Sequence, residues 1–398
     1  MTDAERVLSD APVHGGGRVL LEPATVEELS AALAKASREK LRASVHGAGT
    51  KRDWGPATQP VDLELSTRRL NAVLAHRHGD LTATVQAGAT LADVNRELAR
   101  HGQWLPLDPP FRDRATIGGI VATNDSGPRR QRYGAPRDLI IGVDIVRADG
   151  VAAKGGGIVV KNVAGYDIAR LMTGSFGSLA VITSATFKLF PIPPASRTVV
   201  IESPLAQLAE IAASLASSQL TPTAIEIETS PMRLLVRFES IEAAADQQAA
   251  AVAKSAADRG AAARIVSGDD EVSLWDAHGR PIWDTPGAVV KMTMLPGDVA
   301  AALTWIAGAL TGVDWDAAGR FALGVLLVRV DASVAKQANF INDLRARFAP
   351  GRGSAVIVRG SDNLKAVVDV WGPLGGSLTV MRAVKTSFDP DGILPARF

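Results

Sequence analysis

The second half of the chain repeats one order of secondary-structure elements, and this repeat constrains the fold most strongly. Alternating and helical apolar patterns predict strand, helix, strand, strand, helix and strand, in turn, at 198–203, 205–218, 223–229, 233–239, 241–259 and 263–268. The same order returns at 288–295, 299–313, 313–317, 321–330, 332–347 and 354–360. Two such ferredoxin-like units predict one long antiparallel sheet with helices on one face, which leaves its other face free to cover something.

The first half alternates helix and strand signals in a different order. A Thr-x-x-Glu capping box at Thr25 and Glu28 precedes apolar residues at helical spacing, which predicts a helix over about 25–39. Further patterns predict a helix capped by Thr90, a hairpin turned by Asp149-Gly150, and strands at 41–47, 81–88 and 179–190.

These patterns predict an α+β protein with two domains. The proline-rich segment 191–196 separates a first domain, 1–195, from the sheet domain, 196–370. Residues 371–398 resemble neither repeat unit, so we expect them to return to the first domain.

Composition excludes several classes of function. The chain has no cysteine, which excludes thiolate metal sites, iron–sulfur clusters and a cysteine-linked cofactor, so any redox chemistry needs a borrowed cofactor. The 43 basic and 42 acidic residues are not gathered in blocks, so we expect no nucleic-acid partner. The first ten residues carry acids and no apolar core, and the apolar run 299–313 is shorter than the roughly 20 residues of a spanning helix. We therefore expect a cytoplasmic protein without a transmembrane segment.

Three stretches of small and polar residues carry the candidate chemistry. The loop HGAGT (46–50) follows a predicted strand, where backbone N–H groups can cradle phosphate oxygens. It matches neither the dinucleotide-binding fingerprint nor the P-loop, and a simple glycine turn explains it equally well. The segment 115–127 places small side chains and hydrogen-bonding groups along one bend, which suits a long polar cofactor, and a third stretch spans 165–177.

Taken together, these motifs resemble the FAD-binding domain of the vanillyl-alcohol-oxidase (PCMH-type) flavoprotein family. The resemblance rests on TVEEL, HGAGT, VQAGATLADVN, DPP followed by ATIGGIVATNDSG, YGAPRDLIIG, NVAGYDIARLMTGSFGSLAVIT and FDPDGIL, over roughly residues 20–195 plus the C-terminal tail. It implies a two-subdomain FAD-binding domain. Within the family, PRR, YG, RDLIIG, KNVAGYD and GSFG are most similar to the FAD-binding E subunits of bacterial glycolate oxidases.

The resemblance also assigns individual residues to the cofactor. It implies that the pyrophosphate is bound by Gly47, Ala48, Gly49 and Thr50. It implies that the ribityl and pyrophosphate part of FAD is lined by Pro109 and by residues of the segment 115–127, namely Thr116, Gly118, Gly119, Thr123, Asn124, Ser126 and Gly127. The backbones of Val181 and Ile182 would contact the adenine or the flavin ring. Thr50 occupies the position of the histidine that links FAD in some members, so non-covalent FAD is expected.

The resemblance weakens at the residues that would perform catalysis. Related oxidases of 2-hydroxy acids use a histidine pair for a divalent metal and a further histidine as proton acceptor, whereas only His278 lies beyond residue 101 here. We therefore expect no metal site, leave the catalytic residue unassigned, and interpret His278 as a helix-end residue rather than a general base. Arg280, Lys291 and Arg329 are candidates for binding a carboxylate, or are simply solvated. Arg129-Arg130 is interpreted as surface or as a docking contact.

Three alternatives for the function remain open at this point. In the first, the chain is the FAD-binding subunit of a glycolate oxidase complex, with a paralogous FAD-containing subunit and an iron–sulfur subunit as partners, either cytoplasmic or peripheral at the inner membrane through a partner. In the second, it is an autonomous FAD-dependent dehydrogenase of a small hydroxy acid or alcohol. A scaffold protein without flavin is the third alternative.

Overall fold

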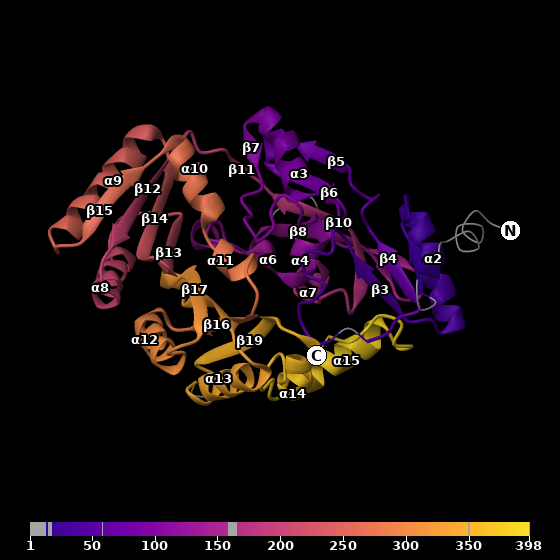
Figure 1. The fold of residues 1–398 in the computed structure, drawn as a ribbon. Helices are drawn as coiled ribbons and strands as arrows, with labels where there is room; N and C mark the ends of the chain where they lie inside the picture. Colours follow the sequence, from indigo (N-terminus) through magenta and orange to yellow (C-terminus); the bar gives the residue numbers. More distant parts are fainter. Residues whose placement is uncertain (1–12, 15–17, 58, 158–164, 349–350, 398) are drawn as a thin grey trace.

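The computed structural model describes residues 13–14, 18–57, 59–157, 165–348 and 351–397. The first ten residues and residues 161–164 of the KNVAGYD motif, both used above, lie outside these ranges. Within the described residues the chain forms an N-terminal half with three smaller sheets and a C-terminal half built on one large sheet (Figure 1).

The large sheet has eight strands, and every neighbouring pair is antiparallel. Its strands, in spatial order, are β15 (Ala262–Val266), β12 (Ala195–Glu202), β14 (Met232–Ser240), β13 (Ala224–Thr229), β17 (Asp314–Arg320), β18 (Val325–Asp331), β16 (Ala288–Met294) and β19 (Gly353–Arg359). Each half of the sheet is one βαββαβ unit, and the two units join where β13 pairs with β17. The predicted double unit is thus confirmed.

The two faces of this sheet differ in chemistry because side chains alternate along each strand. One face is apolar and packs on helices α8 (Leu205–Ala216), α9 (Glu242–Ala257), α12 (Val299–Ala309) and α13 (Val334–Ala346). Figure 1 shows these helices on the outer side, away from the N-terminal half. Residues on the opposite face include Glu226, Lys291 and Arg320, which alternate with the apolar-face residues. This charged face is turned toward the N-terminal half.

One strand of the repeat begins later than its sequence pattern predicts. Residues Phe321–Leu323 form a short 3-10 turn, and β18 starts only at Val325. Between them Gly324 has φ +63, and a side chain at this position would overlap the Met294 carbonyl. The backbone must turn here, so the predicted strand 321–330 is wrong at its start.

The N-terminal half contains a four-stranded sheet, a five-stranded sheet and a two-stranded sheet. The smaller sheet has the order β1 (Val13–His14), β2 (Arg18–Leu21), β4 (Leu63–Ser66) and β3 (Ala43–His46). The larger one has the order β5 (Val73–Arg77), β6 (Thr82–Gln86), β10 (Ala180–Lys188), β8 (Ile140–Arg147) and β9 (Ala152–Gly156). A two-stranded sheet pairs β11 (Phe190–Pro191) with β7 (Gln103–Trp104). Their helices are α2 (Val26–Glu39), α3 (Leu91–Leu98), α4 (Ile117–Thr123), α5 (Arg130–Tyr133), α6 (Pro136–Leu139) and α7 (Ile168–Met172).

Helix α2 begins as its capping box predicts. The Thr25 hydroxyl accepts a hydrogen bond from Glu28 N at 3.2 Å, and the Glu28 carboxylate accepts one from Ala24 N at 2.7 Å. These bonds satisfy backbone donors that the first helical turn leaves without partners. The helix then buries Leu29, Leu33 and its small neighbours against the smaller sheet.

Two helices lie between the large sheet and the N-terminal half. They are α10 (Gly268–Ala277) and α11 (Arg280–Trp283), and Figure 1 shows both beside the N-terminal half. The carboxylate of Asp276 at the end of α10 pairs with Arg112 of the N-terminal half. These helices therefore bridge the two halves.

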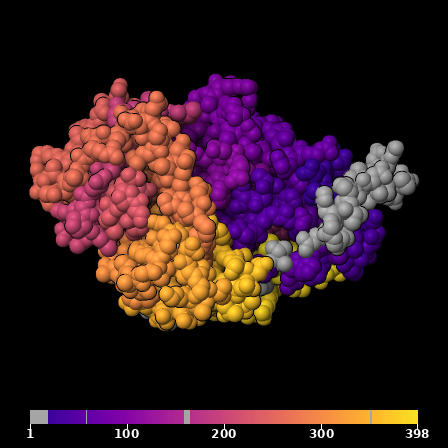
Figure 2. All heavy atoms as spheres, viewed as in Figure 1, coloured from indigo at the N-terminus to yellow at the C-terminus, as the bar shows by residue number. Residues whose placement is uncertain are grey.

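The C-terminal segment packs on the N-terminal half. After α14 (Asp362–Val367) and α15 (Ser377–Phe388), Ile393 and Leu394 join the core around the smaller sheet. Figure 2 shows this yellow segment between the orange sheet region and the indigo N-terminal region. Lys385 anchors it, because its buried ammonium donates to Ser178 O at 2.8 Å and Leu394 O at 2.7 Å and pairs with Asp389.

Removing the Lys385 charge is expected to loosen this segment. In Lys385→Met the buried Asp389 carboxylate loses its cation, so the free energy of unfolding should fall by about 3–5 kcal/mol. Urea unfolding measures the change. The exposed pair of Lys254 with Asp258 is the matched control, and Lys254→Met should cost less than about 1 kcal/mol. Equal losses in both variants would contradict the anchoring role.

Candidate functional site

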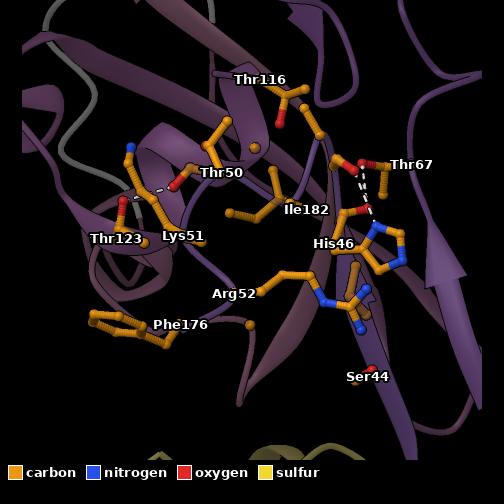
Figure 3. A pocket seen from close by; sticks show the side chains of 18 of the residues that line it. Ser44, His46, Thr50, Lys51, Arg52, Thr67, Thr116, Thr123, Phe176 and Ile182 are labelled. Atoms are coloured by element: carbon orange, nitrogen blue, oxygen red, sulfur yellow. Dashed lines mark hydrogen bonds between the residues drawn. The ribbon is translucent and has the colours of Figure 1, made fainter. Parts of the chain in front are cut away.

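A cavity of about 120 Å³ lies where the loop after β3 meets the N-terminus of α4. Figure 3 shows Thr50, Lys51, Thr116, Thr123 and Phe176 around it. Most residues assigned from the sequence line this cavity: Gly47, Ala48, Gly49, Thr50, Thr116, Gly118, Gly119, Thr123, Val181 and Ile182. The structure therefore brings together three sequence segments that are far apart in the chain.

Four assigned residues do not line this cavity. Pro109 and Gly127 line a second cavity, described below. Asn124 ends α4 with a positive φ of 48°, and its side-chain oxygen accepts a hydrogen bond from Arg137 N at 3.3 Å. Ser126 is buried, and its hydroxyl has no partner among the described residues. The bend 123–127 thus continues away from the first cavity toward the second.

The loop that forms the cavity wall depends on glycine at two positions. Gly49 has a φ of +72, which residues with a side chain rarely adopt. A side chain at Gly47 would overlap Thr116, the residue that precedes α4. The loop therefore lines the cavity with backbone where a side chain would not fit, and such a glycine-rich backbone can offer N–H groups to a diphosphate.

Three cations line the same cavity, and two of them are paired. The buried Lys51 ammonium lies 2.9 Å from Asp125 and 5.4 Å from the centre of the Trp54 ring. Arg52 donates to Glu64 at 2.7 Å. The third cation, Arg397, comes from the C-terminal tail and was not assigned from the sequence. No motif in the sequence singles it out.

His46 also lies at the cavity wall. Its Nδ1 donates to Gly47 O at 3.0 Å, and its Nε2 lies 3.5 Å from Glu64. The imidazole is therefore hydrogen-bonded to the protein through Nδ1 and faces a carboxylate of the protein with Nε2. Its neighbours favour the interpretation of a strand-end residue over a ligand of the cofactor.

A second cavity, of about 330 Å³, separates the N-terminal half from the charged face of the large sheet. Its walls are the loop 108–114, the segment 127–129, the ends of α10 and α11, and β13, β14 and β17. Charged groups predominate in the lining: Asp108, Arg112, Asp113, Arg114, Arg129, Glu226, Arg237, Asp276, His278, Arg280, Asp284 and Arg320. Such a cavity suits a small polar molecule rather than an apolar one.

Two arginines behave differently from their sequence interpretation. Arg129 is not a surface residue, because its guanidinium bonds to Glu239 at 2.9 Å and lies 4.5 Å from the centre of the Trp104 ring. Arg329 is not available to a ligand, because it is buried and paired with Asp314 at 2.6 Å and Asp316 at 2.7 Å. Both placements follow from contacts between segments that are distant in sequence.

His278 lies at the edge of the second cavity between two carboxylates. Its ring nitrogens lie 2.6 Å from Glu228 and 3.0 Å from Glu226. Burial alone would lower the pKa of this imidazole, but the hydrogen bonds to Glu226 and Glu228 prevail and raise its pKa to about 9. The ring is therefore an imidazolium at neutral pH, and it cannot accept a proton from a substrate there.

Lys291 and Arg320 supply positive charge from the same face. Arg320 is buried and donates to the backbone carbonyls of Ser126 and Gly127, so it holds the end of the bend 123–127. Desolvation, with smaller contributions from the like charges of Arg320 and Arg130, lowers the pKa of Lys291 to about 8, and Asp125 opposes this shift. Lys291 is thus a partly buried cation near other cations, and an anion would relieve their repulsion.

Two further features are absent from the described part of the chain. Among those residues, no group of three or more His, Cys, Asp or Glu side chains is arranged to hold a metal ion. Likewise, no helix in that part is both long and apolar enough to cross a membrane.

Removing the His278 imidazole is expected to destabilise the protein in a pH-dependent way. Its folded pKa is raised, so its stabilisation is full below pH 6.5 and is lost as the pH rises through about 9. His278→Leu should therefore lower the free energy of unfolding by about 3–5 kcal/mol at pH 7 and by much less at pH 10. Urea unfolding across this range tests this, with the exposed His101→Leu as control. A deficit that does not change with pH would refute the assignment.

Comparison with known proteins shows what this chain is similar to. Residues 18–155 match the family of the FAD binding domain. The chain is 31% identical over 218 residues to the glycolate oxidase subunit GlcD of Bacillus subtilis, covering 54% of this chain and 46% of that protein. It is 34% identical over 181 residues to the glycolate oxidase subunit GlcE of Escherichia coli, covering 44% of this chain and 51% of that protein. The matches thus span about half the length of these relatives.

Likeness to solved structures extends over the whole chain. The structure of p-cresol methylhydroxylase aligns with a TM-score of 0.72 at 16% identity, covering 99% of this chain and 92% of that one. This confirms the predicted architecture, in which a PCMH-type domain is followed by an antiparallel sheet domain. Residues 18–155 therefore form a FAD-binding domain, and the chain has the fold of the PCMH-type flavoproteins.

Proposed function

We propose that this chain is the FAD-binding subunit of a glycolate oxidase complex, which oxidises glycolate to glyoxylate. One combination of features carries the proposal: a FAD-binding domain faces a charged cavity, yet the chain contains no cysteine and its only histidine beyond residue 101 is held as a cation. Neither an electron exit through a cluster nor an imidazole base comes from this chain. A paralogous flavin subunit and an iron–sulfur subunit would supply them.

The domain division belongs to the same proposal. Residues 1–195 would bind the cofactor, residues 196–370 would cover it with the charged face of the sheet, and residues 371–398 would complete the first domain. Because no helix in the described part of the chain can span a membrane, a cytoplasmic position, or attachment at the inner membrane through a partner, is proposed.

The residues of the first cavity would hold FAD without a covalent bond. Backbone N–H groups of residues 47–50 would bind its diphosphate. Gly118 and Gly119, which have no side chains, line the cavity where the rest of the cofactor would lie. Thr50 offers only a hydroxyl where some relatives have the linking histidine. When bound, FAD supplies a two-electron acceptor for the oxidation of an alcohol.

The second cavity supports a carboxylate-bearing substrate. Arg320 lines this cavity, and Lys291 lies on the same face of the sheet without being part of the lining; Arg320 and Arg130 disfavour the charge of Lys291, and Asp125 favours it. A guanidinium and an ammonium together recognise a carboxylate strongly in a partly buried site. A small 2-hydroxy acid would therefore be oriented by its carboxylate.

An autonomous FAD-dependent 2-hydroxy-acid or alcohol dehydrogenase is the second candidate. The observation that favours it is that this chain alone brings the FAD-binding segments and the charged second cavity together. The two candidates differ in what the isolated chain can do. Only the autonomous enzyme should reduce its own flavin with substrate.

Absorbance spectroscopy and co-purification distinguish these candidates. The purified chain is mixed anaerobically with glycolate, D-lactate and related hydroxy acids while flavin absorbance is followed, and it is also co-expressed with its genomic neighbours. Co-purification of two partners and bleaching only in the assembly would support the subunit. A monomeric chain that is bleached by a hydroxy acid and is fully active with an acceptor dye would overturn it.

A side chain at Gly47 is expected to impair FAD binding. In Gly47→Ala the added methyl meets Thr116, and this overpacking costs about 1–3 kcal/mol and displaces the loop 47–50. FAD affinity, measured by quenching of flavin fluorescence, should fall by about tenfold or more. The double variant with Thr116→Gly should regain affinity, while Gly79→Ala, whose methyl would enter open space, should be unchanged. Wild-type affinity in Gly47→Ala would be the contrary result.

The affinity for a hydroxy acid should depend on the protonation of Lys291. Because its pKa is about 8, the dissociation constant for glycolate should rise by about tenfold per pH unit above pH 8. Titration of flavin absorbance from pH 6.5 to 10 measures it. Lys291→Gln should bind weakly at every pH, and the exposed Lys336→Gln should follow the wild type. A flat wild-type profile would exclude Lys291 from the substrate site.

A further inference from the structure

The C-terminal tail reaches the cofactor cavity. Arg397 lines the first cavity together with the loop 46–52, although these residues lie at opposite ends of the chain. One Nη of Arg397 lies 3.5 Å from the carbonyl of Pro56, just beyond that loop. The tail thus forms a wall of the cavity that the N-terminal segments leave open.

Several hydrogen bonds fix the backbone of the tail in this position. Ala43 N donates to Ile393 O at 2.8 Å, so the tail is bonded to β3, the strand that leads into the loop 46–50. The Asp389 carboxylate accepts from Ile393 N at 2.9 Å and Leu394 N at 2.8 Å. Trp371 Nε1 donates to Arg397 O at 2.5 Å. The placement of Arg397 is therefore determined by the backbone and does not depend on its own side chain.

Within the described part of the chain, the charge of Arg397 is not balanced by a carboxylate. No carboxylate among the described residues forms an ion pair with it, whereas Lys51 is paired with Asp125 and Arg52 with Glu64. Partial burial lowers the pKa of Arg397, and the like charge of Arg52 lowers it further. A cation that is partly desolvated beside another cation is costly unless an anion binds there.

We propose that Arg397 binds the diphosphate of FAD, so that the C-terminal tail is part of the cofactor site. The inference rests on the proposed FAD site at residues 47–50. There the loop offers backbone N–H groups, and the one imidazole at its start, His46, is bonded to Gly47 O and close to Glu64. Arg397 supplies the positive charge that the loop itself does not leave free. Guanidinium recognises phosphate oxygens with directed, charge-assisted hydrogen bonds.

The test compares flavin ligands that differ in phosphate. Apoprotein is titrated with FAD, ADP and riboflavin at 50 and 300 mM salt, with tryptophan or flavin fluorescence as the readout. Arg397→Gln should weaken FAD and ADP by about 10- to 100-fold, reduce the salt dependence of both, and leave riboflavin unchanged. Arg397→Lys, which keeps the charge, should recover part of the loss.

The matched control is Arg382→Gln, which removes the same charge from an exposed position on α15. It should bind all three ligands as the wild type does. Unchanged FAD affinity in Arg397→Gln would overturn the proposal, and so would an equal loss for riboflavin, which would show that the tail acts through shape. These readouts need no turnover, so the proposal can fail while the chain still oxidises a hydroxy acid, or hold while it does not.

Discussion

The pairing of buried charges between the two halves is the interaction on which the rest of the structure depends. Side-chain alternation places Arg237, Glu239 and Arg320 on the face of the sheet that is turned away from its helices. A buried charge without a partner is very costly, so each must meet a counter-charge or a carbonyl. Glu239 forms an ion pair with Arg129, and Arg320 donates hydrogen bonds to two backbone carbonyls of the bend 123–127. These contacts fix how the sheet lies over the FAD-binding domain, and hence the shape of the second cavity.

The same physics explains which parts of the fold follow from sequence. Apolar periodicity and capping residues are local, so the order βαββαβ and the start of α2 at Thr25 could be predicted from neighbouring residues alone. The start of β18 could not be predicted in this way, because the turn before it is determined by its close contact with Met294, a residue of a neighbouring strand. Arg329 and Arg129 were misinterpreted for a related reason, since their partners Asp314 and Glu239 become neighbours only when strands pair or domains meet.

The cofactor cavity shows the same division. The loop 47–50 and the start of α4 carry dense small residues, and this signal locates them correctly in one cavity. Ser126 and Asn124 share the signal but lie outside that cavity, because the chain turns at the positive φ of Asn124. Arg397 has no local signal at all. Its place depends on the bonds of the tail to β3 and to Asp389, which no pattern of spacing within the tail reveals.

The hydrogen bond from Ala43 to Ile393 closes a loop of chain that contains the whole sheet domain. Contacts of such high sequence separation form late, because the entropy of loop closure opposes them until both ends are ordered. The strand pairs of the two repeat units close shorter loops than this one, so their sheet can form first. The sheet domain would then fold before the first cavity is complete. The C-terminal tail with Arg397 would join that cavity last.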